Sequence, residues 1–148
     1  MFYLKGFNYI ITIILYVLIA NFALSQYEED PQELNEEQII ENISPEQAYK
    51  MIEANTGNNN FIILDLRTPQ EHREEHIEKS KNINFLSENF RKELNNLDKE
   101  NTYIIHCRSG SRAAKTLPIM KESGFKKVYN FQGIIQWKEA GLETVKTK

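Results

Sequence analysis

The sequence predicts an α/β fold in which a central parallel sheet carries helices on both faces. Short apolar runs alternate with helical segments along most of the chain, an order typical of parallel sheets with crossover helices. The runs at residues 61–64 and 103–105 are continuously apolar rather than alternating with polar residues. We therefore expect both strands to be covered on both faces.

The first half of the domain is expected to begin near Ile39. Ser44-Pro45-Glu46-Gln47 predicts a helix start, because it places a serine cap, a proline at the first helical position and the glutamine of a capping box in order. The strand at residues 61–64 follows a turn-forming cluster. A short helical turn is then expected at residues 70–75 and a brief strand at residues 83–85.

The second half is expected to contain two more strands and three more helices. Residues 88–97 form an amphipathic segment with Phe90, Leu94 and Leu97 on one face. The elements expected after it are a strand at residues 102–105, a helix at 111–122, a strand at 127–131 and a helix at 133–140. Asp65 and Cys107 each follow a strand, and ligands of parallel sheets bind at the carboxyl ends of strands.

Composition limits the classes of function. The 148 residues are 41% hydrophobic, enough for one domain with its own core. A net charge of −3 provides no basic surface for nucleic acid, so we expect no nucleic-acid partner. The single cysteine excludes an internal disulfide and a multi-cysteine zinc site.

The amino-terminal segment is typical of an export signal. Lys5 is its only charged residue, residues 10–20 are almost wholly apolar, and Ala23-Leu24-Ser25 resembles a cleavage site. We predict a signal peptide at residues 1–25 cleaved after Ser25, an acidic linker at 26–38 and the domain at 39–148. The mature protein is then expected to be periplasmic or secreted.

An uncleaved amino-terminal helix is the alternative. It would anchor the protein in a membrane, although its apolar run is shorter than the ~20 residues that a span usually needs. Contact with a membrane is expected only in this case.

The single cysteine, Cys107, stands where a strand turns into a helix. Backbone amides of such a turn and the dipole of the following helix favour negative charge, and Arg108 and Arg112 add positive charge. These surroundings favour a nucleophilic thiolate. The other interpretation is a small buried apolar residue, which would not need two neighbouring arginines.

Three segments of the chain match one known pattern. LDLRTPQE at residues 64–71 resembles a D-V-R-x-x-x-E block, and HI at 76–77 with NI at 82–83 resembles G-H-I-x-x-A-x-N-I. CRSGSR at residues 107–112 resembles a C-R-S-G-x-R loop. With the closing segment around residues 128–142, these blocks resemble the rhodanese family of sulfurtransferases over about residues 39–142. The resemblance implies a rhodanese-like three-layer fold.

The chain departs from this pattern near the blocks. Glu75 stands where the family has the glycine before its histidine, and Ser80 replaces an alanine. The closing block has only Gly133 where a pair of glycines is usual. Either Gln132 replaces the first glycine or one residue is deleted.

The resemblance implies a thiosulfate sulfurtransferase that carries sulfur as a persulfide on Cys107. The loop residues Arg108, Ser109, Gly110, Ser111 and Arg112 would bind the anionic donor, with Arg112 bracing the loop through a carboxylate such as Asp65. Asp65, Arg67 and His76 are expected to support the site. The expected donor is a thiosulfate-like molecule and the expected acceptor is a thiol, cyanide or a protein thiol. No metal or other cofactor is implied.

Loop length separates sulfur transfer from the nearest enzymatic alternative. Four residues stand between Cys107 and Arg112, whereas related cysteine phosphatases on a rhodanese-like fold use five. The shorter loop favours a single sulfur atom over a phosphate, because the amide cradle must fit the charge that it stabilises. A non-enzymatic sulfur carrier or redox-binding domain is the third interpretation.

Two histidine patterns allow other chemistry. His72-Arg73-Glu74-Glu75-His76 fits H-x-x-E-H, an inverted zinc-protease signature, although a polar turn is the simpler interpretation. His106 precedes Cys107 and could act as a base, but successive strand residues point to opposite faces, which favours a packing role.

Overall fold

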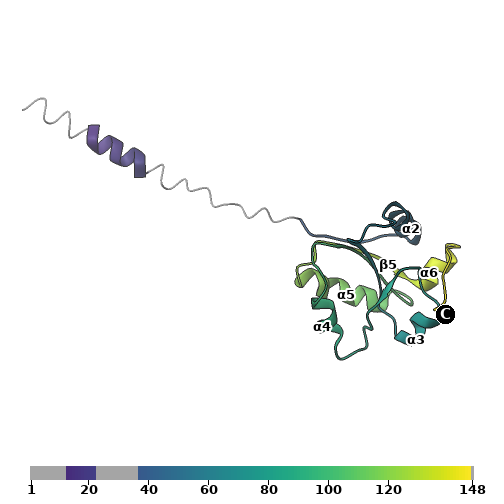
Figure 1. Cartoon of the computed structure of the whole chain (residues 1–148). Coiled ribbons are helices and arrows are strands. Elements are labelled where there is room, and N and C mark those ends of the chain that lie inside the picture. The colour runs from purple at the N-terminus through teal and green to yellow at the C-terminus, as the bar shows by residue number, and fades with distance from the viewer. Residues whose placement is uncertain (1–12, 23–36, 148) are drawn as a thin grey trace, which may run out of the picture. The chain divides into compact units, whose positions relative to one another are not determined.

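The computed structural model of this protein describes residues 13–22 and 37–147. The chain divides into two units, Met1–Asn35 and Glu36–Lys148. In the first unit, residues 13–22 form a helix (Figure 1). The predicted cleavage after Ser25 and most of the predicted linker lie outside the described residues. Across the described ranges, the helices are too short or too polar to cross a membrane.

The second unit is an α/β domain, as the sequence predicts, with a five-stranded sheet in the order β1-β5-β4-β2-β3. All of its strand pairs are parallel. The strands are β1 (Ile39–Asn42), β2 (Phe61–Asp65), β3 (Lys81–Asn82), β4 (Thr102–Cys107) and β5 (Lys127–Gly133). The helices are α2 (Pro45–Ala54), α3 (Pro69–Glu74), α4 (Phe90–Asn95), α5 (Ser111–Glu122) and α6 (Ile134–Glu139).

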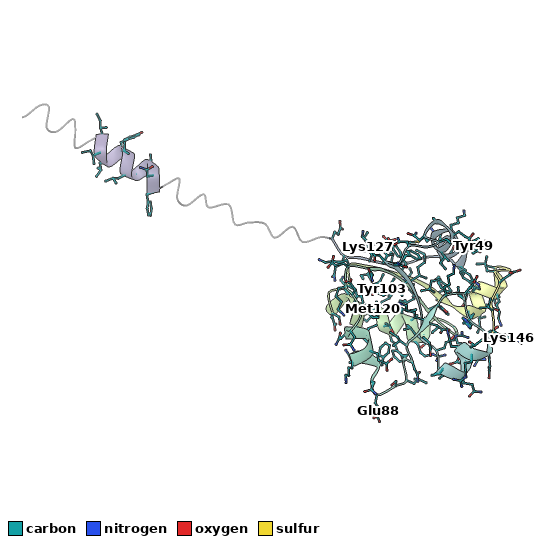
Figure 2. The ribbon with its side chains drawn as sticks, in the orientation of Figure 1. Tyr49, Glu88, Tyr103, Met120, Lys127 and Lys146 are labelled. Carbon is teal, nitrogen blue, oxygen red and sulfur yellow. The ribbon has the colours of Figure 1, made fainter. Side chains whose placement is uncertain are left out.

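The two faces of the sheet bury separate apolar clusters, which confirms helices on both faces (Figure 1). On one face, side chains of α4 and α5 such as Leu94 and Met120 pack with Tyr103. Figure 2 shows Tyr103 and Met120 in the interior of the domain. On the other face, Ala48 of α2 and Trp137 of α6 pack over the sheet.

Two strands differ from the prediction. β1 was not predicted: its four residues add an edge to β5 and are too few to show a pattern in the sequence. The brief strand expected at residues 83–85 was wrong, because pairing with β2 occurs at Lys81–Asn82 instead. The chain still follows β2 for a few residues, since the amide of Ile83 donates to the Asp65 carbonyl oxygen.

A register shift between β4 and β5 shapes the sheet next to Cys107. Ile105 pairs with Asn130, but Cys107 pairs with Gly133, so β5 has one more residue than β4 over this stretch. This is the geometry of a β-bulge. Gly133 then comes so close to the loop that a Cβ atom there would stand 2.4 Å from the carbonyl oxygen of Arg108.

Replacing Gly133 by alanine should destabilise the domain by about 3 kcal/mol, the upper end of the usual range for overpacking, because the atoms in the way are backbone atoms. The cost is steric, because the φ of −164° at Gly133 suits any residue. Gly57→Ala is the control: Gly57 has a φ of +85° but no atom within 4 Å of the added methyl. It should cost only roughly 1–2 kcal/mol. Urea unfolding of both variants checks this, and equal losses would contradict it.

Candidate active site

Cys107 is the last residue of β4 and only 1% exposed. Its Sγ accepts a hydrogen bond from the Gly110 amide at 3.2 Å. Gly110 has a φ of 100° and caps the start of α5. The left-handed turn that glycine allows thus aims a backbone amide at the sulfur, as the sequence led us to expect.

The other loop residues surround this sulfur on the solvent side. Arg108, Ser109 and Ser111 are exposed, whereas Arg112 in the first turn of α5 is half-buried. The amino-terminal end of a helix of this length attracts anions. The loop therefore places a buried sulfur, a backbone amide that donates to it and exposed hydrogen-bond donors within six residues.

Arg112 is held by Glu71, not by Asp65 as predicted. Its Nη1 and Nη2 each donate to one Glu71 carboxylate oxygen at 2.9 Å, the fork geometry that arginine favours. These bonds lower the pKa of Glu71 to about 2. They also raise the pKa of Arg112, to which nearby Cys107 makes a smaller contribution. The Asp65 carboxylate is not available to Arg112, because Arg67 already binds it.

Glu71 ends the LDLRTPQE block, but no supporting role was predicted for it from the sequence. Thr68 and Glu71 form the capping box of α3: the Thr68 amide donates to the Glu71 carboxylate at 2.9 Å, and the Glu71 amide donates to Thr68 Oγ1 at 3.2 Å. T-x-x-E could have located this cap in the sequence. It could not reveal that the same carboxylate binds an arginine 41 positions away.

Asp65 and Arg67 form a buried ion pair at the end of β2. The Arg67 Nε donates to Asp65 Oδ1 at 2.9 Å and its Nη2 to Oδ2 at 2.6 Å. Burial would raise the pKa of Asp65, but the hydrogen bonds and charge of Arg67, together with His106 and His72, outweigh it and lower the pKa to about 2. Arg67 Nη2 also donates to the Glu75 carbonyl oxygen, which fixes the end of α3.

His106 faces away from the thiol, as strand alternation predicts. It is fully buried and stacks on Phe131 with ring centroids 5.0 Å apart, in the cluster opposite to the one that contains Cys107. Burial lowers the pKa of His106 to about 4 although the Asp65 carboxylate opposes this shift. The two groups, 4.0 Å apart, are therefore not an ion pair at neutral pH.

The H-x-x-E-H segment does not have the geometry of a zinc site. α3 ends at Glu74, so His76 lies beyond the helix, and its ring stacks on the ring of His72 instead of converging with it on one point. His72 Nδ1 lies 3.0 Å from Asp65 Oδ2, and Glu75 binds Lys138. Within residues 13–22 and 37–147, no three His, Cys, Asp or Glu side chains are grouped to hold a metal.

His76, predicted to support the site, joins α3 to the end of the chain. Its Nδ1 lies 2.9 Å from the His72 carbonyl oxygen and its ring stacks on His72 with centroids 4.2 Å apart. Its backbone exchanges two hydrogen bonds of 2.8 Å with Val145. His76 thus contacts α3 and the terminal segment.

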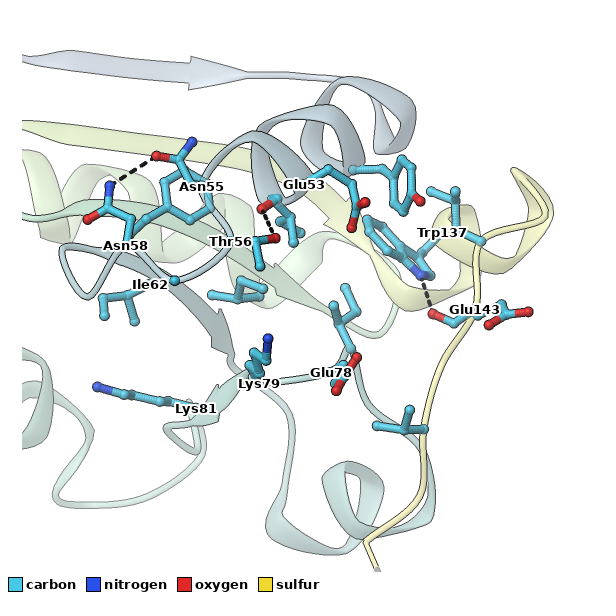
Figure 3. Close-up of a pocket in the computed structure, with 18 of the residues that line it drawn as sticks. Glu53, Asn55, Thr56, Asn58, Ile62, Glu78, Lys79, Lys81, Trp137 and Glu143 are labelled. Atoms are coloured by element: carbon cyan, nitrogen blue, oxygen red, sulfur yellow. Dashed lines mark hydrogen bonds between the residues drawn. The ribbon is translucent and has the colours of Figure 1, made fainter.

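A groove of about 760 Å³ lies on another part of the domain (Figure 3). It is lined by α2, by the first residues of β2 and by Trp137, whose Nε1 donates to the Glu143 carbonyl oxygen at 2.9 Å. No residue of the loop 107–112 lines it. The groove is therefore separate from the loop around Cys107.

Comparison with known sequences defines the class of protein. The sequence model of the rhodanese-like domain matches residues 44–140. Thiosulfate sulfurtransferase GlpE of Actinobacillus pleuropneumoniae is 28% identical over 101 residues, 68% of this chain and 88% of that protein. An uncharacterized Synechocystis protein, slr1261, is 32% identical over 88 residues, which are 59% of this chain and 48% of the relative. The match thus spans about half the length of slr1261.

Solved structures show the same fold. A rhodanese-related protein from Thermoplasma volcanium superposes with a TM-score of 0.61 at 27% identity, over 71% of this chain and 97% of that one. A polysulfide-sulfur transferase homodimer from Wolinella succinogenes superposes with a TM-score of 0.58 at 26% identity, over 75% and 80% of the two chains. The chain belongs to the rhodanese-like domain family.

Acid should destabilise the domain in two separate pH windows. An unfolded His106 binds a proton near pH 6.5, but the folded one only near pH 4, so stability falls by about 3 kcal/mol between these values. The lowered pKa values of Asp65 and Glu71 confine their losses to lower pH, between about 4 and 2. Urea unfolding at pH values from 7 to 4 tests this. The free energy of unfolding should fall less with decreasing pH in His106→Phe than in the parent protein, and an equal fall in both would contradict the prediction.

Proposed function

We propose that this protein is a sulfurtransferase that moves sulfane sulfur from thiosulfate or a similar donor to a thiol or cyanide. The carrier is a persulfide on Cys107. The observation that carries the proposal is the hydrogen bond from Gly110 to Cys107 Sγ in a loop with four residues between Cys107 and Arg112. The family and the sulfurtransferase relatives support the same reaction class.

The first half-reaction loads the cysteine. The Cys107 thiolate attacks the outer sulfur of thiosulfate, an S–S bond forms, and the bond between the two thiosulfate sulfurs breaks. The electron pair of the broken bond leaves with sulfite, so Cys107–S⁻ and S₂O₃²⁻ become Cys107–S–S⁻ and SO₃²⁻. Exposed Arg108 can bind the sulfonate oxygens and neutralise the departing sulfite.

The second half-reaction unloads it. A thiolate or cyanide attacks the outer sulfur of the persulfide and takes it as R–S–S⁻ or thiocyanate, which restores the Cys107 thiolate. The Gly110 amide and the dipole of α5 stabilise the anion in both steps. Ser109 and Ser111 supply further donors from exposed positions. Both steps balance without a metal or other cofactor.

We also propose that the protein is exported, with a donor and an acceptor outside the cytoplasm. The support is the amino-terminal sequence alone. Intact-mass analysis of the protein from producing cells tests it: a chain that begins at Gln26 is expected. A chain that keeps residues 1–25 in the membrane fraction would establish the anchored alternative instead.

Mass spectrometry after incubation with thiosulfate tests the sulfur transfer. The protein should gain one sulfur, about 32 Da, on Cys107, and cyanide should remove it as thiocyanate. Cys107→Ser should gain nothing, because a hydroxyl does not form the persulfide. Arg112→Lys keeps the charge but loses the fork to Glu71 and should load more slowly.

Two results would contradict the proposal. Hydrolysis of a phosphate ester without any sulfur adduct would establish the phosphatase alternative. One loading event without turnover, in the presence of cyanide and small thiols, would instead identify a sulfur carrier that serves a particular partner.

A further inference from the structure

Gln132 has a backbone conformation that side chains rarely adopt. Its φ is 78°, in the left-handed region, where a Cβ atom meets the following carbonyl oxygen and glycine alone avoids the cost. This conformation indicates that Gln132 stands in for a glycine rather than marking a deletion. In the part of the chain that the structure describes, Lys79 is the other non-glycine residue with a positive φ.

The β-bulge and a buried side chain hold Gln132 in this conformation. Gln132 belongs to the stretch of β5 that has one residue more than β4. Its amide donates to Asn130 Oδ1 at 2.9 Å, and Asn130, 3% exposed, is itself bound by its Nδ2 to Asn42 Oδ1 at 2.8 Å. Bulges beside active sites commonly re-aim a side chain.

The bulge brings Gln132 against the loop that holds Cys107. A Cβ atom on Gly110 would stand 3.2 Å from the Cβ of Gln132, and the Gly110 amide is the group that donates to Cys107 Sγ. Gln132 is nevertheless exposed. In the described part of the chain the Gln132 carboxamide makes no hydrogen bond, so its N–H groups are available to a ligand.

We propose that Gln132 is a donor-selecting residue whose carboxamide N–H donates to the oxyanion of the incoming sulfur donor. This inference rests on the proposed function and assigns that site a preference for donors with a sulfonate-like group. A neutral amide adds a hydrogen bond to an anion without adding charge. Retention of a costly backbone conformation beside a reactive group is typical of functional sites.

The loading half-reaction of the full chain, followed by mass at varied thiosulfate concentration, tests the proposal. Gln132→Gly should raise the KM for thiosulfate about tenfold, the loss of one hydrogen bond to an anion, without lowering the Tm. Gln132→Glu keeps size and backbone conformation but repels the donor, and should raise the KM further. Unloading by 2-mercaptoethanol, whose thiolate has no sulfonate-like oxygens, should keep its rate in Gln132→Gly.

Lys79→Gly is the matched control, because Lys79 is exposed, has a φ of 63° and lies on the groove away from the loop. It should relieve a similar backbone cost and leave the KM unchanged. A wild-type KM in both Gln132 variants would overturn the inference, and so would an equal rise in Lys79→Gly.

Failure of the proposed function is distinguishable from failure of this inference. If the wild-type protein forms no persulfide, the proposed sulfur transfer is wrong. The role of Gln132 in donor binding can then still be tested by calorimetry of thiosulfate binding to Cys107→Ser. Weaker binding after adding Gln132→Gly supports the inference, and unchanged or absent binding overturns it.

Discussion

The buried ion pair between Asp65 and Arg67 is the interaction on which the carboxyl-terminal edge of the sheet depends. A paired charge in the interior is stable only when its remaining hydrogen-bonding capacity is used, and removal of one partner commonly costs ~3–5 kcal/mol. Here the chain around the pair supplies those bonds. The Arg67 amide donates to Asp65 Oδ1 at 3.0 Å, His72 Nδ1 lies 3.0 Å from Asp65 Oδ2, and Arg67 Nη2 donates to the Glu75 carbonyl oxygen. The side chain of Asn82 donates to the backbone carbonyl oxygens of Asp65 and Arg67 at 2.9 and 2.8 Å.

The backbone and side chains of Asp65 and Arg67 together thus connect β2, β3 and the end of α3. Because α3 is fixed in this way, the carboxylate of Glu71 in its first turn has a defined position opposite α5. The bidentate contact with Arg112 then fixes the start of α5 from one side. Gly133 packs against the carbonyl of Arg108 from the other side. The loop around Cys107 is consequently clamped by two elements that are distant from it in sequence.

The sequence predicted the elements whose cause is local. Continuous apolar runs located β2 and β4, and the serine-proline start located α2 with its capping box. The place of Cys107 at the end of a strand predicted a backbone amide donor beside its sulfur, and the Gly110 amide is that donor. The α5 bounds were also confirmed, since glycine punctuates both ends of that helix.

What the sequence could not provide was pairing across distance. Asp65 and Glu71 are both carboxylates near the same loop, and only the fold decides which of them meets Arg112. Residues 39–42 form the strand β1 only because they pair with β5, which lies much later in the sequence. The positive φ of Gln132 is likewise a property of the bulge, which depends on the register of two strands and not on the residue itself.

The strand order also sets when the domain can fold during its synthesis. β1 comes first along the chain and pairs only with β5, which is the last strand to be made and lies in the interior of the sheet. Contacts of such long sequence separation form slowly, because a large loop must close before they contribute. A nascent chain that lacks residues 127–133 has no place for β1 and no cover for one side of β4. Completion of the sheet therefore waits until residues 127–133 have been made, and β1 and β2–β4 cannot join into one sheet before then.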